Sequence, residues 1–328
     1  METPDPKDHL GPVVSVVIPT RNRPDLVLRA VLSALNQTFG KLEVIVVIDG
    51  PDASTTASLD QVSDARLRVI ALSQSVGGSD ARNAGVKASC GEWIAFLDDD
   101  DEWLPAKIEK QMGLAVQTNG DALIATRLIA QTPESNFLIP RRLPDSHEAI
   151  CEYLFCQRSA FAGEAQIQTS AVLVNRKLAE AVPFTSGLRR HQDTEWYLRL
   201  AERKVVSFRF IDEPLVIWHL DENRKRISNT ARWRDTRDWL RTNASRMTPR
   251  AYSGFAATQL AAEAEGDWRG IWASFREMTR PGFPSLFTIA IFLRICCLPA
   301  RFRRRVRAWV HGVSSSASAV ISVNPKHA

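Results

Sequence analysis

The chain has 328 residues, of which 45% are hydrophobic and 24% are charged, and its formal net charge is +5. This composition is that of a globular protein with a sizeable core, and it argues against disorder along most of the chain. The modest positive charge suits anionic ligands such as phosphates and does not by itself indicate nucleic acid. The five cysteines form no CxxC pair and no histidine has zinc-finger spacing, so we expect neither a disulfide framework nor structural zinc.

Residues 1–12 (METPDPKDHLGP) are polar and rich in proline, and they contain no apolar segment of the kind that secretory signals carry. We expect them to form a flexible N-terminus. Because the cysteines follow no pairing pattern, a reducing cytoplasm is the expected location.

Residues 13–101 alternate predicted strands with predicted helices. Four unbroken apolar runs predict strands: Val14–Ile18, Leu42–Ile48, Leu67–Leu72 and Trp93–Leu97. Helices are expected at Asp25–Gln37 and Ser79–Ser89. Apolar strands separated by helices are typical of a parallel sheet that is covered on both faces. Such open sheets bind ligands at the carboxyl ends of their strands, where this sequence places polar and turn residues.

The rest of the chain predicts a mixed region at residues 102–228 and a helical region at residues 229–311. The mixed region has predicted strands at Ala122–Ala130 and Ser170–Val174, and predicted helices from Pro105 and at Asp193–Arg203. The helical region has predicted helices at Arg250–Gly266, Trp268–Met278 and Ser285–Leu298. Residues 312–328 are rich in serine and alanine, and we expect a disordered tail there.

The most informative segment is the run of Asp98, Asp99, Asp100 and Asp101 directly after a predicted buried strand. Four adjacent carboxylates repel one another and cost stability unless a cation neutralises them. Carboxylate oxygens suit Mg²⁺ or Mn²⁺, and such ions usually share their coordination with substrate phosphates. The run therefore predicts a metal site. The alternative is a solvated acidic turn that caps the helix near Pro105.

Two other polar segments follow predicted strands. Asp49 could accept hydrogen bonds from a nucleobase or a ribose, or it could form an Asx turn that supports the next residues. In the segment 77–85 (GGSDARNAG), the glycines allow a ligand to approach the backbone closely, and Arg82 can neutralise phosphate. The alternative is a loop and helix packed tightly against the sheet. The segment matches neither the GxGxxG fingerprint nor a P-loop.

Asp193 lies at the start of a predicted helix, within the sequence RRHQDTEW. An acid at a helix N-terminus often serves only as a cap or as a complement to the helix dipole. For an isolated aspartate we would prefer that interpretation, but together with the other segments a functional role for Asp193 is favoured.

Four segments together resemble glycosyltransferase family 2. They are SVVIPTRNRP, VIVVIDGPD, GGSDARNAGVKASCGEWIAFLDDDDEW and HQDTEWYLRL, and they occur in that family's order and at its usual separations. The third segment is quite specific, and the others reinforce it. The resemblance implies a GT-A fold over residues 13–228: a mostly parallel α/β sheet flanked by helices, with the helical extension 229–311. Residues 13–101 would form its nucleotide-binding half and residues 102–228 its acceptor-binding half.

The resemblance also implies roles for individual residues. Asp193 would be the catalytic base, and Asp98 and Asp100 would take the DxD positions that hold Mg²⁺ or Mn²⁺. The residues expected to contact the nucleotide sugar are Pro19, Thr20, Arg21, Asp49, Gly78, Arg82, Asn83, Asp98 and Asp99.

The reaction that the resemblance implies is an inverting, metal-dependent transfer of a sugar from a nucleotide diphosphate donor. UDP is the expected nucleotide of the donor, because it is common in this family. The acceptor would be a hydroxyl of a glycan or a lipid-linked glycan, in the synthesis of a cell-surface polysaccharide or glycoconjugate. No nucleic acid is expected as a partner.

Three positions depart from the family's pattern or allow more than one interpretation. Gln192 stands where glutamate is commoner in the family, which removes one charge beside the expected base. Residues 229–233 (NTARW) match the QxxRW signature of processive members only in part, so a single-addition enzyme is favoured. His219 falls where many relatives have a histidine, and it could ligate the metal, contact the diphosphate, or be a partly buried structural residue.

The apolar segment Ser285–Leu298 is too short to span a membrane, which needs roughly 20 apolar residues. Five arginines follow it: Arg301, Arg303, Arg304, Arg305 and Arg307. An apolar helix followed by arginines fits an in-plane contact of residues 285–310 with anionic lipid on the inner face of the membrane. The alternative is a terminal helix that closes the helical region, with solvated arginines.

Two other functions remain as alternatives. A nucleotidyltransferase also combines a nucleotide-binding fold with acidic metal ligands, but it needs a glycine-rich signature after the first strand, which Pro19–Asn22 does not provide. The other alternative is a catalytically degenerate nucleotide-sugar-binding protein, and Gln192 is the one feature that points to it.

Overall fold

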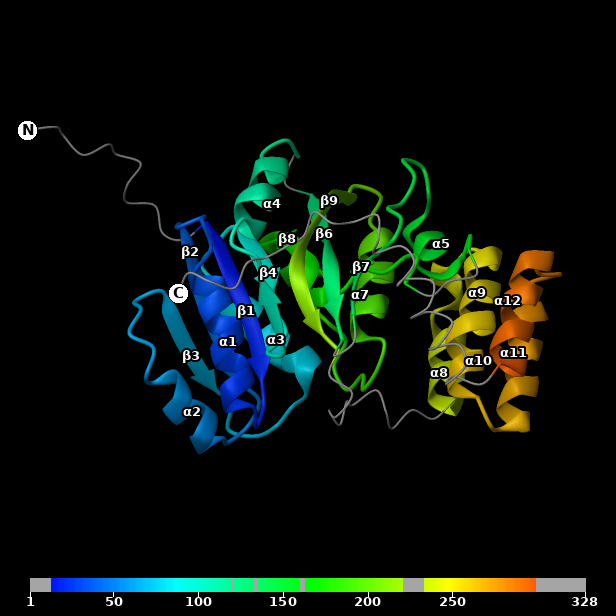
Figure 1. Ribbon diagram of the computed structural model, residues 1–328, viewed down its shortest axis with the longest axis horizontal. Helices are drawn as coiled ribbons and strands as arrows, with labels where there is room; N and C mark the ends of the chain where they lie inside the picture. Colours follow the sequence, from blue (N-terminus) through cyan, green and yellow to red (C-terminus); the bar gives the residue numbers. More distant parts are fainter. Residues whose placement is uncertain (1–12, 119–120, 133–134, 160–162, 221–232, 299–328) are drawn as a thin grey trace, which may run out of the picture.

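The computed structural model describes residues 13–118, 121–132, 135–159, 163–220 and 233–298 (Figure 1). The features expected for residues 1–12 and 312–328, and most of the partial processivity signature at residues 229–233, lie outside these ranges. None of the helices in the described part of the chain has both the length and the apolar character needed to cross a membrane.

The strands of the described residues form one mixed sheet in the order β3-β2-β1-β4-β8-β6-β9-β5, and β7 pairs with β6. They are β1 Val14–Thr20, β2 Leu42–Ile48, β3 Leu67–Ala71, β4 Trp93–Phe96, β5 Asp101–Trp103, β6 Ala122–Gln131, β7 Asn136–Ile139, β8 Val172–Asn175 and β9 Ser207–His219. The strands β1 to β4 pair in parallel with one another. Strand β8 is antiparallel to both β4 and β6, so the second half of the sheet is mixed.

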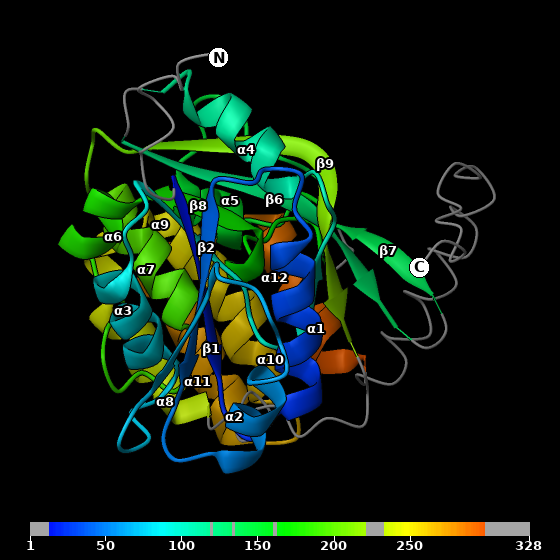
Figure 2. The same cartoon turned by 90° about the vertical axis from the view of Figure 1, so that its left-hand side faces the viewer.

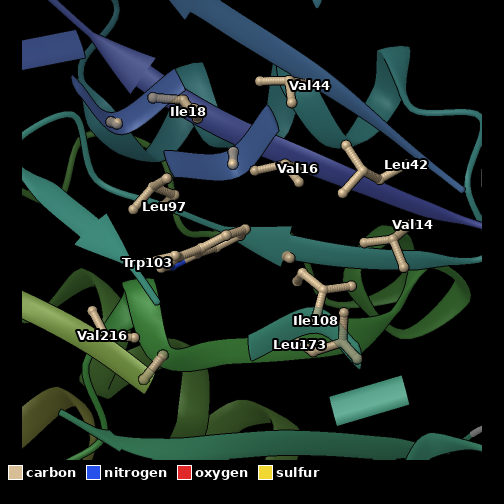
Figure 3. Packing of buried hydrophobic residues seen from close by; sticks show 14 of the residues in the cluster. Val14, Val16, Ile18, Leu42, Val44, Leu97, Trp103, Ile108, Leu173 and Val216 are labelled. Atoms are coloured by element: carbon tan, nitrogen blue, oxygen red, sulfur yellow. The ribbon is translucent and has the colours of Figure 1, made fainter. Parts of the chain in front are cut away.

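Helices cover both faces of this sheet. They are α1 Pro24–Leu35, α2 Ala53–Leu59, α3 Gly78–Ala88, α4 Lys107–Ala115, α5 Ile150–Phe155, α6 Arg176–Ala181 and α7 Gln192–Ala201, with a 3₁₀ turn at Thr169–Ala171. Along β1, Val16 and Ile18 pack in the core that α1 also lines (Figure 3). Val17 packs in the core that α3 lines, and α1 and α3 lie on opposite sides of β1 (Figure 2). Alternate residues of a strand face opposite sides, and both sides are buried here. This explains why β1 reads as an unbroken apolar run.

The C-terminal helices form a separate layer at the end of the molecule away from α1 and α2 (Figure 1). They are α8 Trp233–Thr242, α9 Pro249–Phe255, α10 Ala261–Glu263, α11 Trp268–Thr279 and α12 Leu286–Cys297, with a 3₁₀ turn at Ala244–Arg246 and a π-helical turn at Ala256–Leu260. Their buried side chains share one cluster with Cys151 and Phe155 of α5 and Leu198 of α7. The helical region therefore packs against the sheet through α5 and α7.

The predicted fold class is confirmed: a mostly parallel sheet flanked by helices, with C-terminal helices after it. Every predicted strand and helix that was given with both bounds is present, and its ends differ from the prediction by at most three residues. One expectation is wrong for β3, because this strand lies at the edge of the sheet and Arg68, Val69 and Ala71 are exposed. Only Leu67 and Ile70 are half-buried, each against a different core cluster, so the cover of β3 is partial.

Candidate active site

The predicted site lies at the carboxyl ends of the parallel strands. Strand β1 lies between β2 and β4, so the residues that follow these three strands meet at one edge of the sheet. The backbone N–H of Asp49 donates to the carbonyl of Thr20 at 2.9 Å, and that of Leu97 donates to Val17 at 3.1 Å. The strand order thus brings the acidic run, Asp49 and Thr20 into one neighbourhood.

Arg82 of α3 joins two predicted parts of the site. Its Nη2 donates to Oδ1 of Asp98 at 2.5 Å, and its Nη1 donates to Oε1 of Gln192 at 3.1 Å. Gly78 lies against the same group, since a Cβ added there would be 3.2 Å from Arg82 Nη1. The guanidinium therefore bridges the acidic run after β4 and the first residue of α7, which are far apart in the sequence.

Asp99 is almost fully buried beneath the acidic loop. Its Oδ2 accepts from Thr20 Oγ1 at 2.8 Å, and its Oδ1 accepts from Arg23 Nη1 at 2.8 Å. Burial raises the pKa of Asp99 to about 6, with Asp100 adding to the rise, although the contact with Arg23 acts in the opposite direction. The protein therefore holds a carboxylate here against its desolvation cost.

The other two acids of the run differ in their surroundings. Asp100 remains about a quarter exposed, with Oδ2 at 3.4 Å from Arg23 Nη1. Asp101 begins β5 and is fully buried, and its Oδ2 accepts from Ser170 Oγ at 2.5 Å and from Gln168 Nε2 at 2.6 Å. Burial, followed by the charge of Asp100, raises the pKa of Asp101 well above its usual range. Asp98 and Asp100 are thus the accessible members of the run.

Asp49 organises the loop that precedes α3. Its Oδ1 accepts from the backbone N–H of Val76 at 2.6 Å, and its Oδ2 accepts from Ser75 Oγ at 2.9 Å. Ser75 Oγ in turn accepts from Arg21 Nη1 at 2.6 Å. Both carboxylate oxygens therefore have partners within the chain. Pro19 lies within β1, opposite Val47 of β2.

Asp193 occupies the first turn of α7 and lies close to the acidic loop. Its Oδ1 accepts from the backbone N–H of Thr194 at 2.8 Å. Loss of hydration raises the pKa of Asp193, and the nearby Asp98 adds to this rise, while the charge of Arg82 opposes it. A carboxylate with a raised pKa, next to a partly exposed acidic loop, has the properties of a general base.

The helical region fixes the start of α7. His191, directly before the helix, has a positive φ of 57°, and its ring lies 4.7 Å from that of Trp239 in α8. Its Nε2 is 3.2 Å from Thr236 Oγ1, which donates to Glu263 of α10 at 2.5 Å. Burial, with the nearby charge of Arg190, lowers the pKa of His191 to about 4, so the imidazole is neutral near pH 7.

Within the described ranges, two of the predicted site residues, Asn83 and His219, make their contacts beside the acidic loop and not with its aspartates. The amide of Asn83 donates to the carbonyl of Phe184 at 2.8 Å and accepts from its N–H at 2.9 Å, so it holds the segment around Phe184. His219 follows Trp218, which pairs with Asp101 across β9 and β5, and its Nε2 is 3.5 Å from Glu102 Oε2. The histidine therefore lies beside the strand that continues the acidic run.

The sequence did not single out four residues that contact or flank this site. Arg23 pairs with Asp99, and Arg29 Nη2 donates to the carbonyl of Asp100 at 2.8 Å. Ser170 Oγ accepts from the backbone N–H of Asp98 at 3.0 Å. Tyr197 is buried one helical turn after the predicted base. Arg23 and Tyr197 stand inside the segments SVVIPTRNRP and HQDTEWYLRL but were given no role, and Arg29 and Ser170 belong to no motif.

The carboxylates of Asp98 and Asp100 suit a divalent cation in their chemistry. No group of three or more histidine, cysteine or acidic residues among the described residues is arranged to hold a metal. Mg²⁺ is commonly bound by only one or two carboxylates, with waters and substrate phosphates completing the octahedron. Two partly exposed acids fit such a cation when a diphosphate is also present.

Comparison with known protein families gives one match over about half of the chain. Residues 15–182 match the model described as Glycosyl transferase family 2. The amylovoran biosynthesis glycosyltransferase AmsB of Erwinia amylovora is 29% identical over 216 residues, which cover 63% of this chain and 69% of AmsB. WfgD of Escherichia coli, a UDP-Glc:α-D-GlcNAc-diphosphoundecaprenol β-1,3-glucosyltransferase, is 31% identical over 107 residues. That alignment covers 33% of this chain and 42% of WfgD, which is less than half of its length.

Solved structures share the fold over nearly the whole chain. Staphylococcus aureus TarS 1–349 in complex with UDP-GlcNAc has a TM-score of 0.57 at 14% identity, and the match covers 91% of this chain and 92% of that one. The mannosyltransferase PcManGT of Pyrobaculum calidifontis, in complex with GDP-Man and Mn²⁺, has a TM-score of 0.52 at 17% identity, with 94% and 87% covered. At these identities the likeness shows the fold alone.

Proposed function

Because the chain belongs to glycosyltransferase family 2, we propose that it transfers a single sugar from a nucleotide diphosphate donor to an acceptor hydroxyl, with inversion. UDP is the proposed nucleotide and a lipid-linked glycan the proposed acceptor, in bacterial polysaccharide synthesis. The part of AmsB in amylovoran biosynthesis supports the pathway class, and the donor and acceptor of WfgD support these two choices.

The observation that carries this proposal is the bridge made by Arg82. It contacts Asp98 at 2.5 Å and Gln192 at 3.1 Å, so the acidic loop and the first turn of α7 lie next to each other, which supports one shared site. A donor diphosphate held at the loop would then have its sugar near Asp193. A nucleotidyltransferase would not need a further carboxylate with a raised pKa, such as that of Asp193, on a separate helix.

In the proposed reaction, the acceptor oxygen attacks the anomeric carbon of the donor sugar. A bond forms between these two atoms while the bond from the anomeric carbon to the diphosphate oxygen breaks. The carboxylate of Asp193 takes the proton of the acceptor hydroxyl, and the nucleoside diphosphate leaves with the bonding electrons. General-base assistance of this kind contributes roughly 10²–10⁴ in rate.

We propose that Mg²⁺ or Mn²⁺ bound by Asp98 and Asp100 would neutralise charge on the leaving diphosphate when it is present. Thr20 and Arg23 hold Asp99 beneath this loop, and Arg82 carries a further positive charge beside it. His219 stays a candidate for an outer contact to the same site.

The remaining assignments stay proposals of the same kind. Pro19, Arg21 and Asp49 would shape the nucleotide pocket, with Asp49 acting through the loop at residues 75–77 that it holds. Residues 13–101 would bind the nucleotide, residues 102–228 would bind the acceptor, and residues 229–311 would support them. The amide of Gln192 would position Arg82 in place of the commoner glutamate.

The test is the effect of Asp193→Asn on transfer and on donor binding. We expect transfer from a UDP-sugar to fall by roughly 10²-fold or more, because asparagine cannot take a proton. Donor affinity should stay within about threefold, since the proposed metal site is intact, a change of less than 1 kcal/mol. Asp121→Asn, at an exposed acid of the same fold, is the matched control and should transfer at the wild-type rate.

Two results would contradict the proposal. Wild-type rates in Asp193→Asn would remove the base assignment. A wild-type chain that binds donor but shows neither transfer to any glycan acceptor nor donor hydrolysis would favour the degenerate binding protein.

A further inference from the structure

The outer surface of the helical region is unusually apolar. Of the fourteen exposed large hydrophobic side chains among the described residues, eight lie between residues 268 and 298. Scattered exposed apolar residues are normal on a soluble surface, whereas a concentration of them marks an interaction site. The two helices that carry most of them, α11 and α12, lie at the outer end of the molecule (Figure 1).

Helix α11 presents a stripe of aromatic residues to solvent. Trp268, Trp272 and Phe275 follow the i, i+4, i+7 spacing that places them on one side of a helix, and their exposed fractions are 74%, 56% and 38%. The rings of Trp272 and Phe275 stack at 5.6 Å. The stripe is therefore an organised surface, called here the aromatic face.

Helix α12 is apolar on both of its sides. Ile291, Phe292 and Ile295 are buried against the rest of the helical region. The outward positions 286, 290, 293 and 297 are leucine, alanine, leucine and cysteine, and Leu286 and Leu293 are 81% and 52% exposed. A helix at the surface of a soluble protein normally carries polar residues on its outer side. The inner side of α12 therefore closes the helical region, as one of the two interpretations expected, and contact of its outer side with lipid stays a prediction.

The two helices form one continuous surface. Phe275 of the aromatic face lies 6.1 Å from Phe292 of α12, measured between ring centroids. Phe283, in the loop that connects the helices, is 88% exposed. With 12 residues each, neither helix is long enough to cross a bilayer. Contact with a membrane would therefore be made along the sides of the helices.

The exposed charge of α11 and of the loop after it is mostly positive: Arg269, Arg276 and Arg280 are exposed, Glu277 is buried, and the exposed Glu265 and half-buried Asp267 precede α11. From Met278 to the end of the sequence there is no aspartate or glutamate. Of the basic residues in this stretch, Arg280 and Arg294 are described, whereas the arginines at 301, 303, 304, 305 and 307 and Lys326 lie outside the described residues. The guanidinium of Arg269 lies 5.6 Å from the ring of Trp268. Tryptophan beside arginine is typical of the membrane interface, where the ring sits at headgroup level and the cation meets anionic lipid.

We propose that the aromatic face of α11, Phe283 and the outer side of α12 dock on an anionic phospholipid membrane, with both helices lying in the plane of the interface. The charge distribution favours this occupant over a second copy of the chain, because a symmetric contact would bring the two basic surfaces together. The inference does not rest on the proposed sugar transfer, since the surface is separate from the acidic loop.

The experiment is flotation of the full chain with lipid vesicles. We expect the wild-type chain to float with phosphatidylcholine vesicles that contain about 30 mol% phosphatidylglycerol, and far less with phosphatidylcholine alone. Raising NaCl from about 0.1 M to about 0.5 M should weaken binding, because the shorter Debye length screens the arginines. The double variant Trp268→Ser, Leu286→Ser should bind about tenfold more weakly or worse, as two exposed apolar anchors are lost.

The matched control is Val116→Ser, Val205→Ser, at exposed positions outside the helical region whose exposed fractions are 77% and 69%. It should float as the wild type does, and all chains should share one thermal midpoint. Absence of wild-type flotation, equal binding to neutral vesicles, or unchanged binding of the Trp268→Ser, Leu286→Ser variant would each overturn the proposal. So would self-association of the wild type, without flotation, that this variant abolishes, because the occupant would then be a second copy.

Discussion

Replacing Asp99 with asparagine should stabilise the metal-free protein near neutral pH. Burial raises the pKa of Asp99 from an ordinary value near 3.9 to about 6. The folded state therefore binds a proton more tightly than the unfolded state does, so stability falls as pH rises from about 4 to about 6. A difference of about two pKa units corresponds to about 3 kcal/mol, which Asp99→Asn should recover at about pH 7.5.

Thermal unfolding in EDTA measures this effect. At an unfolding entropy of about 2.1 cal/mol/K per residue, 3 kcal/mol raises the midpoint of this chain by about 4 °C. At about pH 4.5 the gain should be much smaller, because Asp99 is then largely protonated in the folded wild type. The control Asp64→Asn should not be stabilising, since hydrogen bonds with Arg66 lower the pKa of Asp64.

The refuting result is a lower midpoint for Asp99→Asn than for the wild type at neutral pH. It would mean that the contacts of Asp99 with Arg23 and Thr20 outweigh the lost hydration of its carboxylate. A midpoint gain confined to neutral pH would instead indicate that the acidic loop is kept at a cost to stability, as expected of a functional site.

Two further predictions follow from the packing and the charges. Gly254→Ala should lower the free energy of unfolding by about 1–3 kcal/mol or more, because its Cβ would lie 2.4 Å from the backbone oxygen of Phe155. Gly113→Ala, in a helix with no atom within 4 Å of the new Cβ, should be neutral or stabilising; equal midpoints for the two variants would contradict the docking of α9 on α5. Gln192→Glu should move the acidic limb of the pH profile of kcat/KM to higher pH, because a second negative charge raises the pKa of Asp193 further. A limb that stays in place would show that the two side chains do not interact.

The sheet could be predicted from the sequence because strands that are buried on both faces appear as unbroken apolar runs. Val14–Ile18 and Leu42–Ile48 are unbroken apolar runs, and the structure places both at the centre of the parallel half. Strand β5 could not be found, because its three residues begin with the buried Asp101 and continue the acidic run. Its pairing with β9 depends on residues more than a hundred positions away.

The sequence predicts where the candidate site residues lie along the strands, but it does not predict their contacts. The ends of β1 and β4 were visible, but the link from Asp98 to the start of α7 came only from the family resemblance. Taken alone, Asp193 is a helix-capping acid. The donor contact expected of Asn83 stays a prediction, and the bond from its amide to the carbonyl of Phe184 could not be read from the sequence.

The most direct test of the central claim, that Asp98 and Asp100 form a cation-dependent donor site, is calorimetric titration of UDP into the full chain, once with Mn²⁺ and once with EDTA. We predict that UDP binds with Mn²⁺ and that EDTA weakens binding at least about tenfold, or about 1.4 kcal/mol. Equal affinity in both solutions, or no binding of UDP, GDP or dTDP by the folded chain, would contradict the account.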